Sequence, residues 1–190
     1  RHGDEEVEFY NIDANRPKYK EALQHIIDAQ PDILGVSAVV STAYEYTKKI
    51  TLDVKKACPD TLIVVGGNLA ASAETLLKRT GTDMCVLGEG EATFLKIVQR
   101  ARLTKNPVDY RDIPGITYID GLGDIINTGY EVPIDKTEVY DLDWQDLARS
   151  TDISNFIFDP YESGQAVPWL DFDSRSKESH RIGKKMIEMH

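Results

Sequence analysis

The sequence predicts an α/β domain built on a mostly parallel sheet with helices on its faces. Short apolar runs alternate with segments of helical periodicity over the first hundred or so residues. Glycines and small polar residues stand directly after the apolar runs, where strand-to-helix turns are expected. Repeated strand–helix units of this kind form parallel strands joined by right-handed crossovers.

The strands and helices are predicted in chain order from these patterns. Residues 6–12 alternate apolar and polar side chains, which predicts a strand, and residues 19–29 repeat apolar side chains at helical spacing. Residues 33–40 are nearly all apolar and rich in β-branched side chains, which is typical of a strand buried on both faces. A helix over 44–57 ends before Pro59. The remaining predicted units are a strand at 62–65, a helix at 73–79, a strand at 84–87 and a helix at 92–102.

The alternation of predicted strands and helices ends after residue 105. Two short strands around a glycine-containing turn predict a β-hairpin over 116–128. From 131 to 178 the chain carries 12 acidic and 4 basic residues without a sustained period. We therefore divide the chain into an α/β domain at 4–105, a hairpin region at 106–130 and an acidic connector at 131–190.

The predicted strand order raises a question about the first strand. A flavodoxin-like (Rossmann-like) sheet has the order 2-1-3-4-5, in which residues 6–12 would be the second strand and the first would precede Arg1. The fold is thus predicted to lack its first strand. Because an unpaired edge of a buried strand is costly, three alternatives remain. Upstream residues were removed, residues 7–12 pair directly with 33–37, or another segment fills the gap.

Composition excludes several classes of function. With 32 acidic and 22 basic side chains the net charge is -10, and no cluster of Lys and Arg offers a local exception, so nucleic acid is not an expected partner. Cys58 and Cys85 stand alone without a CxxC motif, which favours a reducing cytoplasm. No apolar stretch approaches the roughly 20 residues of a membrane helix, so no membrane partner is expected.

Candidate site residues follow from the strand ends. Ligands of open α/β sheets bind outside the carboxyl ends of the strands. Glycine lets a ligand approach the backbone, and Ser, Thr and Asn supply hydrogen-bonding groups. Each glycine pair alone is also explained as a tight turn, but both fall at one edge of the sheet. The candidate residues are Ser37, Ala38, Val39, Ser41, Thr42, Gly66, Gly67, Asn68, Gly88, Glu89 and Gly90.

The common nucleotide-binding motifs do not match. A dinucleotide site needs GxGxxG after the first strand, whereas Gly88-x-Gly90 follows a late strand and continues to Thr93. The chain has no GxxxxGK[ST] phosphate loop. A phospho-acceptor receiver would carry Asp where Ser37 stands.

The spacing of two blocks does match a known signature. Ser37-Ala38-Val39 is followed by 26 residues and then by Gly66-Gly67. This resembles the cobalamin-binding signature of a Ser-x-Leu and a later Gly-Gly, with Val39 in place of Leu. The stretches "PDILGVSAVVSTAY", "VVGGNLAAS" and "DMCVLGEGEATFLKIV" resemble three blocks of the cobalamin-binding domain that precedes the barrel of cobalamin-dependent radical S-adenosylmethionine (SAM) enzymes. The resemblance covers about residues 4–105, and Gly-Glu-Gly-Glu is its most specific part.

The resemblance implies a cofactor and a parent enzyme. Cobalamin would place its nucleotide tail in the crevice beside Gly66 and Gly67, and Ser37, Ser41 or Thr42 would hydrogen-bond it. The Gly88 turn would form a rim, although Glu91 also suits a helix N-terminus. The chain itself would bind without catalytic residues or metal ligands of its own. The parent would add a radical SAM barrel with a [4Fe-4S] cluster and S-adenosylmethionine, for methyl transfer or related radical chemistry.

Two other functions remain open. The chain could be a stand-alone corrinoid-carrying or ligand-sensing module. It could also be a degenerate scaffold domain that binds no cobalamin. A CxxxCxxC motif downstream of His190 would favour the enzyme, and retention of cobalamin would exclude the scaffold.

Overall fold

The computed structural model describes residues 6–39 and 41–132, together with residues 157–158 and 186–187. The chain divides into two compact units, one of residues 18–139 and one of residues 1–17 with 140–190. The first unit holds a five-stranded sheet, and the second holds the helix α1 (Ile12–Asn15) and the antiparallel strands β6 (Ile157–Phe158) and β7 (Met186–Ile187). Most of the predicted connector lies outside the described residues.

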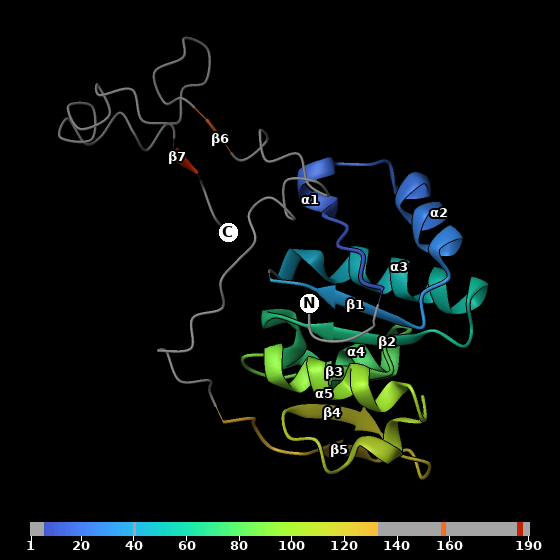
Figure 1. Cartoon of the computed structure of the whole chain (residues 1–190), viewed down its shortest axis with the longest axis vertical. Helices are drawn as coiled ribbons and strands as arrows, with labels where there is room; N and C mark the ends of the chain where they lie inside the picture. The colour runs from blue at the N-terminus through green and yellow to red at the C-terminus, as the bar shows by residue number, and fades with distance from the viewer. Residues whose placement is uncertain (1–5, 40, 133–156, 159–185, 188–190) are drawn as a thin grey trace, which may run out of the picture. The chain divides into compact units, whose positions relative to one another are not determined.

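The five strands lie in chain order across the sheet (Figure 1). The first three strands are parallel, and the predicted hairpin is confirmed as an antiparallel pair that continues the same sheet. The strands are β1 (Ile33–Ser37), β2 (Leu62–Gly66), β3 (Met84–Val86), β4 (Ile116–Ile119) and β5 (Ile125–Asn127). The mixed sheet with flanking helices agrees with the predicted α/β fold class.

Helices cover both faces of this sheet. On one face α3 (Tyr44–Ala57) and α4 (Ala73–Arg79) bury their apolar side chains against β2 and β3, and α2 (Tyr19–Ala29) packs on α3. On the other face α5 (Glu91–Ala101) buries Ile97 in a cluster with Val64, Met84 and Ile116. The 3₁₀ turns are η1 (Ser41–Ala43), η2 (Asn68–Ser72) and η3 (Pro107–Tyr110).

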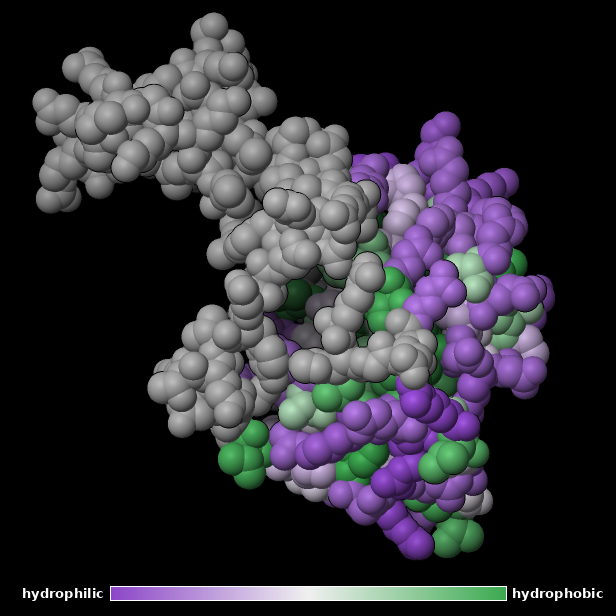
Figure 2. All heavy atoms as spheres, in the orientation of Figure 1, coloured by the Kyte–Doolittle hydropathy of each residue, from purple (hydrophilic) through white to green (hydrophobic). Residues whose placement is uncertain are grey.

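The surfaces of these helices match their sequence patterns. Lys20, Gln24 and Asp28 are exposed on α2, and Figure 2 shows hydrophilic residues over that helix. No helix in the described ranges has the length and apolar character needed to cross a bilayer.

The strand predicted at 6–12 is wrong. Residues 6–11 have no regular structure, and α1 begins at Ile12 because the Asn11 side chain accepts a hydrogen bond from the Ala14 N–H at 3.0 Å. Such a side-chain cap competes locally with strand pairing. Val7 and Phe9 are 80% and 54% exposed, so the alternation marks no buried face. Direct pairing of residues 7–12 with β1 is therefore excluded.

The absence of a strand at residues 6–11 also affects the pairing of β1. Among the described residues β1 is paired on one side only, with β2. The strand predicted over 33–40 also ends earlier than expected, at Ser37. The other predicted boundaries agree closely with the structure.

Both cysteines are free, and Cys85 is part of the core. It lies in β3 beside its register partner Val65 and packs with the α4 side chains, and burial raises the pKa of its thiol to about 12. A thiol with so high a pKa stays protonated at neutral pH and is a poor nucleophile. Cys85 is thus a packing residue.

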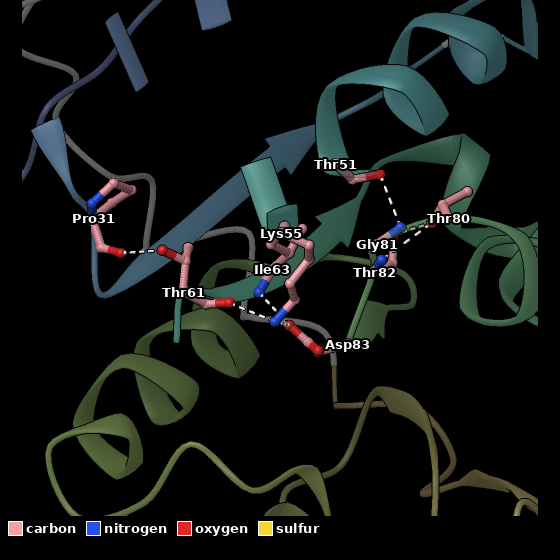
Figure 3. Close-up of polar contacts among 9 residues, drawn as sticks. All are labelled: Pro31, Thr51, Lys55, Thr61, Ile63, Thr80, Gly81, Thr82 and Asp83. Atoms are coloured by element: carbon pink, nitrogen blue, oxygen red, sulfur yellow. Dashed lines mark hydrogen bonds and ion pairs between the residues drawn. The ribbon is translucent and has the colours of Figure 1, made fainter. Parts of the chain in front are cut away.

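A polar network fixes the amino ends of β2 and β3, opposite the predicted site (Figure 3). The Lys55 ammonium on α3 donates to the Thr61 carbonyl at 2.6 Å and pairs with Asp83 Oδ2 at 2.7 Å. The same Asp83 oxygen accepts the Ile63 N–H at 2.7 Å. This amino-edge network joins α3 to the start of both strands.

Gly81 brings the loop before β3 against α3. Its N–H donates to Thr51 Oγ1 at 3.1 Å, and a Cβ on Gly81 would lie 2.4 Å from the Thr51 carbonyl oxygen. That oxygen belongs to helix backbone and has little freedom to move. Only glycine fits at this position.

We expect Gly81→Ala to destabilise the protein by about 1–3 kcal/mol, because the added methyl group forces loop and helix apart. Urea unfolding followed by circular dichroism measures the change. Gly121→Ala is the matched control, since a Cβ there meets nothing within 4 Å, and its midpoint should be unchanged or slightly higher. Equal midpoints for the two variants would contradict the close approach.

Candidate functional site

The carboxyl ends of β1, β2 and β3 meet at one edge of the sheet because these strands are parallel. β4 runs antiparallel to β3, and β5 antiparallel to β4, so β5 also ends at this edge. We call it the carboxyl edge. All the candidate residues predicted from the sequence either end β1 or β2 or lie in the segments that leave β1, β2 and β3 here.

Ser37 and Gly66 lie side by side as the last residues of β1 and β2. They are partners in the parallel register, and residues so paired face the same side of the sheet. Ser37 is exposed, and the Ala38 N–H donates to the Gly66 carbonyl at 3.1 Å. The exposed Ser37 side chain thus lies next to a glycine and can form hydrogen bonds with a ligand.

Ala38 differs from its neighbours. It is 3% exposed and packs with Val65 and Leu69 on the α4 side, so its methyl group belongs to the core. Its carbonyl accepts the Leu69 N–H at 3.0 Å, which ties the loop after β1 to the loop after β2. Ala38 contributes at the carboxyl edge through its backbone.

The two glycines at 66 and 67 serve different purposes. A Cβ on Gly66 would meet no heavy atom within 4 Å. Gly67 has φ +78, and a Cβ there would lie 2.6 Å from the Ala38 carbonyl oxygen. The need for glycine at 67 thus arises inside the chain, whereas Gly66 opens free space at the edge.

The polar candidates surround this opening. Val39, Thr42 and Asn68 are exposed, and η1 and η2, which carry the last two of these residues, contact each other. Ser41 begins η1, and its side chain lies outside the described part of the structure. The loops after β1 and β2 therefore form one continuous surface.

The Gly88 turn leads from β3 into α5. Gly88 has φ +78 and is exposed, and a Cβ on Gly90 would approach Val86 Cγ1 at 3.3 Å. Glu89 is exposed, as is Glu91 at the first position of α5, where a negative charge is favoured by the helix dipole. The residues at the end of this turn are therefore explained in part by the start of α5, without a ligand.

A further segment reaches the carboxyl edge that the sequence did not indicate. We call residues 128–132 the return segment, because it leaves β5 and runs back past the start of β4. Thr128 holds it there: its N–H donates to the Ile116 carbonyl at 3.0 Å, and its Oγ1 accepts the Ile116 N–H at 3.0 Å. A Cβ on Gly88 would lie 3.8 Å from Tyr130 Cδ1.

Glu131 anchors the return segment to α5. Its carboxylate pairs with the Lys96 ammonium, and this hydrogen bond lowers the pKa of the carboxyl group. Sequence patterns gave no reason to join these residues to the site, because the hairpin's place beside β3 was not predictable. The one feature of the sequence that could have pointed to this segment is the pair of apolar residues, Tyr130 and Val132, just after the hairpin glycine.

In the described part of the chain, no group of three or more His, Cys, Asp or Glu side chains could hold a metal ion. The carboxyl edge instead combines small exposed residues, hydroxyl and amide groups and open space at Gly66.

Comparison with protein families identifies the domain. The model of the B12 binding domain matches residues 2–98, which is half of the chain. The chain belongs to the B12-binding domain family. The match confirms the resemblance read from the Ser37 and Gly66-Gly67 blocks.

Solved structures of two other proteins share the fold. The cobalamin-dependent SAM radical enzyme OxsB with aqua-cobalamin bound is 22% identical, with a TM-score of 0.51 over 61% of this chain and 16% of that one. The radical SAM methyltransferase TsrM from Kitasatospora setae, with tryptophan and a SAM analogue bound, is 17% identical, with a TM-score of 0.52 over 62% of this chain and 23% of that one. These similarities confirm the predicted flavodoxin-like fold.

Two curated relatives are anaerobic magnesium-protoporphyrin IX monomethyl ester cyclases. The protein from Cereibacter sphaeroides is 25% identical over 168 residues, which are 85% of this chain and 26% of the cyclase. The protein from Rubrivivax gelatinosus is 25% identical over 165 residues, which are 86% of this chain and 29% of the cyclase. The chain thus spans about a quarter of the length of these cyclases.

The two glycines can be separated by stability measurements. Gly67→Ala should destabilise the protein by about 1–3 kcal/mol, because alanine is strained at positive φ and its methyl group meets the Ala38 carbonyl. Gly66→Ala should leave the free energy of unfolding within about 0.5 kcal/mol of the original, because its methyl group enters open space. Similar losses for both variants would show that Gly66 is also enclosed.

Proposed function

We propose that this chain binds cobalamin at the carboxyl edge, with the nucleotide tail entering beside Gly66 and Ser37. The observation that carries the proposal is the open space at Gly66, in register with an exposed hydroxyl, in a domain of the B12-binding family. A side chain at 66 would fill the space that the tail needs. The residues present therefore fit this cofactor.

The chain's own groups orient the tail by hydrogen bonding. The Ser37 hydroxyl both donates and accepts, and Thr42 and Asn68 add polar groups from the neighbouring loops. Ser41 is proposed with them from the sequence. Gly67 acts through its backbone, since its positive φ and its close approach to the Ala38 carbonyl shape the loop after β2.

The loops further along the edge form the rim. Val39 is exposed in the loop after β1, and Gly88, Glu89 and Gly90 continue the rim after β3. Ala38 and Gly67 contribute backbone only. The rim is proposed to face the corrin side of the cofactor.

We further propose that the parent chain supplies a radical SAM barrel with a [4Fe-4S] cluster and S-adenosylmethionine. The similar solved structures are radical SAM enzymes, and the chain spans about a quarter of the cyclases it matches, which supports this view. Bound cobalamin supplies a cobalt centre that can carry a methyl group. In this arrangement residues 4–105 hold the cofactor, and residues 106–130 and 131–190 lead towards the barrel.

The reaction is proposed only as methyl transfer or related radical chemistry, because the relatives include both a methyltransferase and cyclases. The two free cysteines support a reducing, cytoplasmic setting. A CxxxCxxC motif after His190 in the parent gene would distinguish this enzyme from a stand-alone corrinoid carrier.

Binding is tested by mixing the chain with hydroxocobalamin, removing free ligand and recording the visible spectrum. We expect one equivalent to be retained. Gly66→Leu should abolish retention, because its side chain enters the open space that begins at the Cβ position, and its urea midpoint checks that the variant is folded. Gly121→Leu, which fills open space in the hairpin turn at the opposite edge, should retain the ligand fully.

Two results would contradict the proposal. A spectrum without corrinoid absorption for the original chain would favour the degenerate scaffold. Full retention by a folded Gly66→Leu variant would place the ligand elsewhere.

A further inference from the structure

The return segment presents one large aromatic side chain at the carboxyl edge. Tyr130 is 75% exposed, although it lies within van der Waals distance of the Gly88 position, 3.8 Å from where a Cβ would be. Val132, two residues on, is 79% exposed. Both side chains stand on one short segment at the carboxyl edge, and a contiguous exposed apolar patch marks a ligand or partner surface.

The segment that carries Tyr130 is held on both sides. The Thr128 N–H and hydroxyl form hydrogen bonds with the Ile116 backbone, and the Glu131 carboxylate pairs with the Lys96 ammonium. The Glu131 side chain is 15% exposed, so it turns inward while the residues on either side of it turn outward. These contacts hold the backbone on both sides of Tyr130 and leave its ring exposed.

Tyr130 shares its edge with the proposed cofactor opening. Gly66 ends β2 and Gly88 follows the adjacent strand β3, and the two strands are paired through Val64 with Met84 and Val65 with Cys85. Adjacent strands are spaced about 4.8 Å apart. A ligand with its tail beside Gly66 and a wide ring system outside the strand ends would extend towards the Gly88 turn.

We propose that Tyr130 contacts the corrin ring of cobalamin and forms an apolar wall of its site. This inference rests on the proposed function and adds a residue on a segment outside the three sequence blocks. A phenol ring suits the task, because its body packs against an apolar macrocycle while its hydroxyl stays in contact with water or an amide. Val132 extends the same wall.

Titration of the full chain with hydroxocobalamin tests the contact. Tyr130→Ala should raise the Kd roughly tenfold, and Tyr130→Phe should stay within about threefold of the original, because the ring is kept. Leu122→Ala is the matched control: Leu122 is 88% exposed on the same hairpin, but in the turn at the opposite edge, and its loss should leave the Kd unchanged.

A second measurement uses the unaltered chain. Tetranitromethane should nitrate Tyr130 readily in the free protein, and saturating hydroxocobalamin should lower the yield at this residue at least about fivefold, as read by peptide mass spectrometry. The buried Tyr110 should remain unmodified in both samples. This measurement needs no variant to fold.

The outcomes separate the two proposals. If the original chain retains no cobalamin, the proposed function fails and this inference fails with it. If the chain binds cobalamin but Tyr130→Ala binds equally well and nitration is unprotected, the proposed function stands and the Tyr130 contact is overturned.

Discussion

The parallel, in-register pairing of β1, β2 and β3 is the constraint on which the rest of the structure depends. It brings Ser37 next to Gly66 and directs the loops after all three strands to one edge. The apolar side chains that fix this register are buried between α3 and α4 on one face and α5 on the other. A shift of one residue would turn these side chains to the wrong face, so the core that stabilises the sheet also places the site.

Close backbone approaches at the two ends of the sheet support this arrangement. At the amino edge Gly81 lies against the Thr51 carbonyl, and at the carboxyl edge Gly67 lies against the Ala38 carbonyl. Both glycines are explained by contacts within the chain. Gly66 is not explained in this way, because a Cβ there would meet no heavy atom within 4 Å, and it is therefore the glycine on which the proposed site rests.

The antiparallel hairpin gives the carboxyl edge its last wall. Because β4 reverses direction beside β3 and β5 reverses again, the chain returns to the edge that the parallel strands define. The bonds from Thr128 to Ile116 and the pair of Glu131 with Lys96 then keep the return segment there. A region outside the cobalamin-binding signature is thereby brought next to the Gly88 turn.

The sequence by itself determined the alternation of strands and helices, the family and the loops that carry the candidate site. These depend on local periodicity and on short blocks such as Ser37-Ala38-Val39 and Gly66-Gly67, which are visible without a fold. The strand predicted at 6–12 failed because a short alternation does not show what its apolar side would pack against. Only the tertiary structure decided the different roles of Gly66 and Gly67, the core position of Ala38 and the place of Tyr130. Each depends on contacts between residues distant in the chain, and such contacts exist only once the strands are paired.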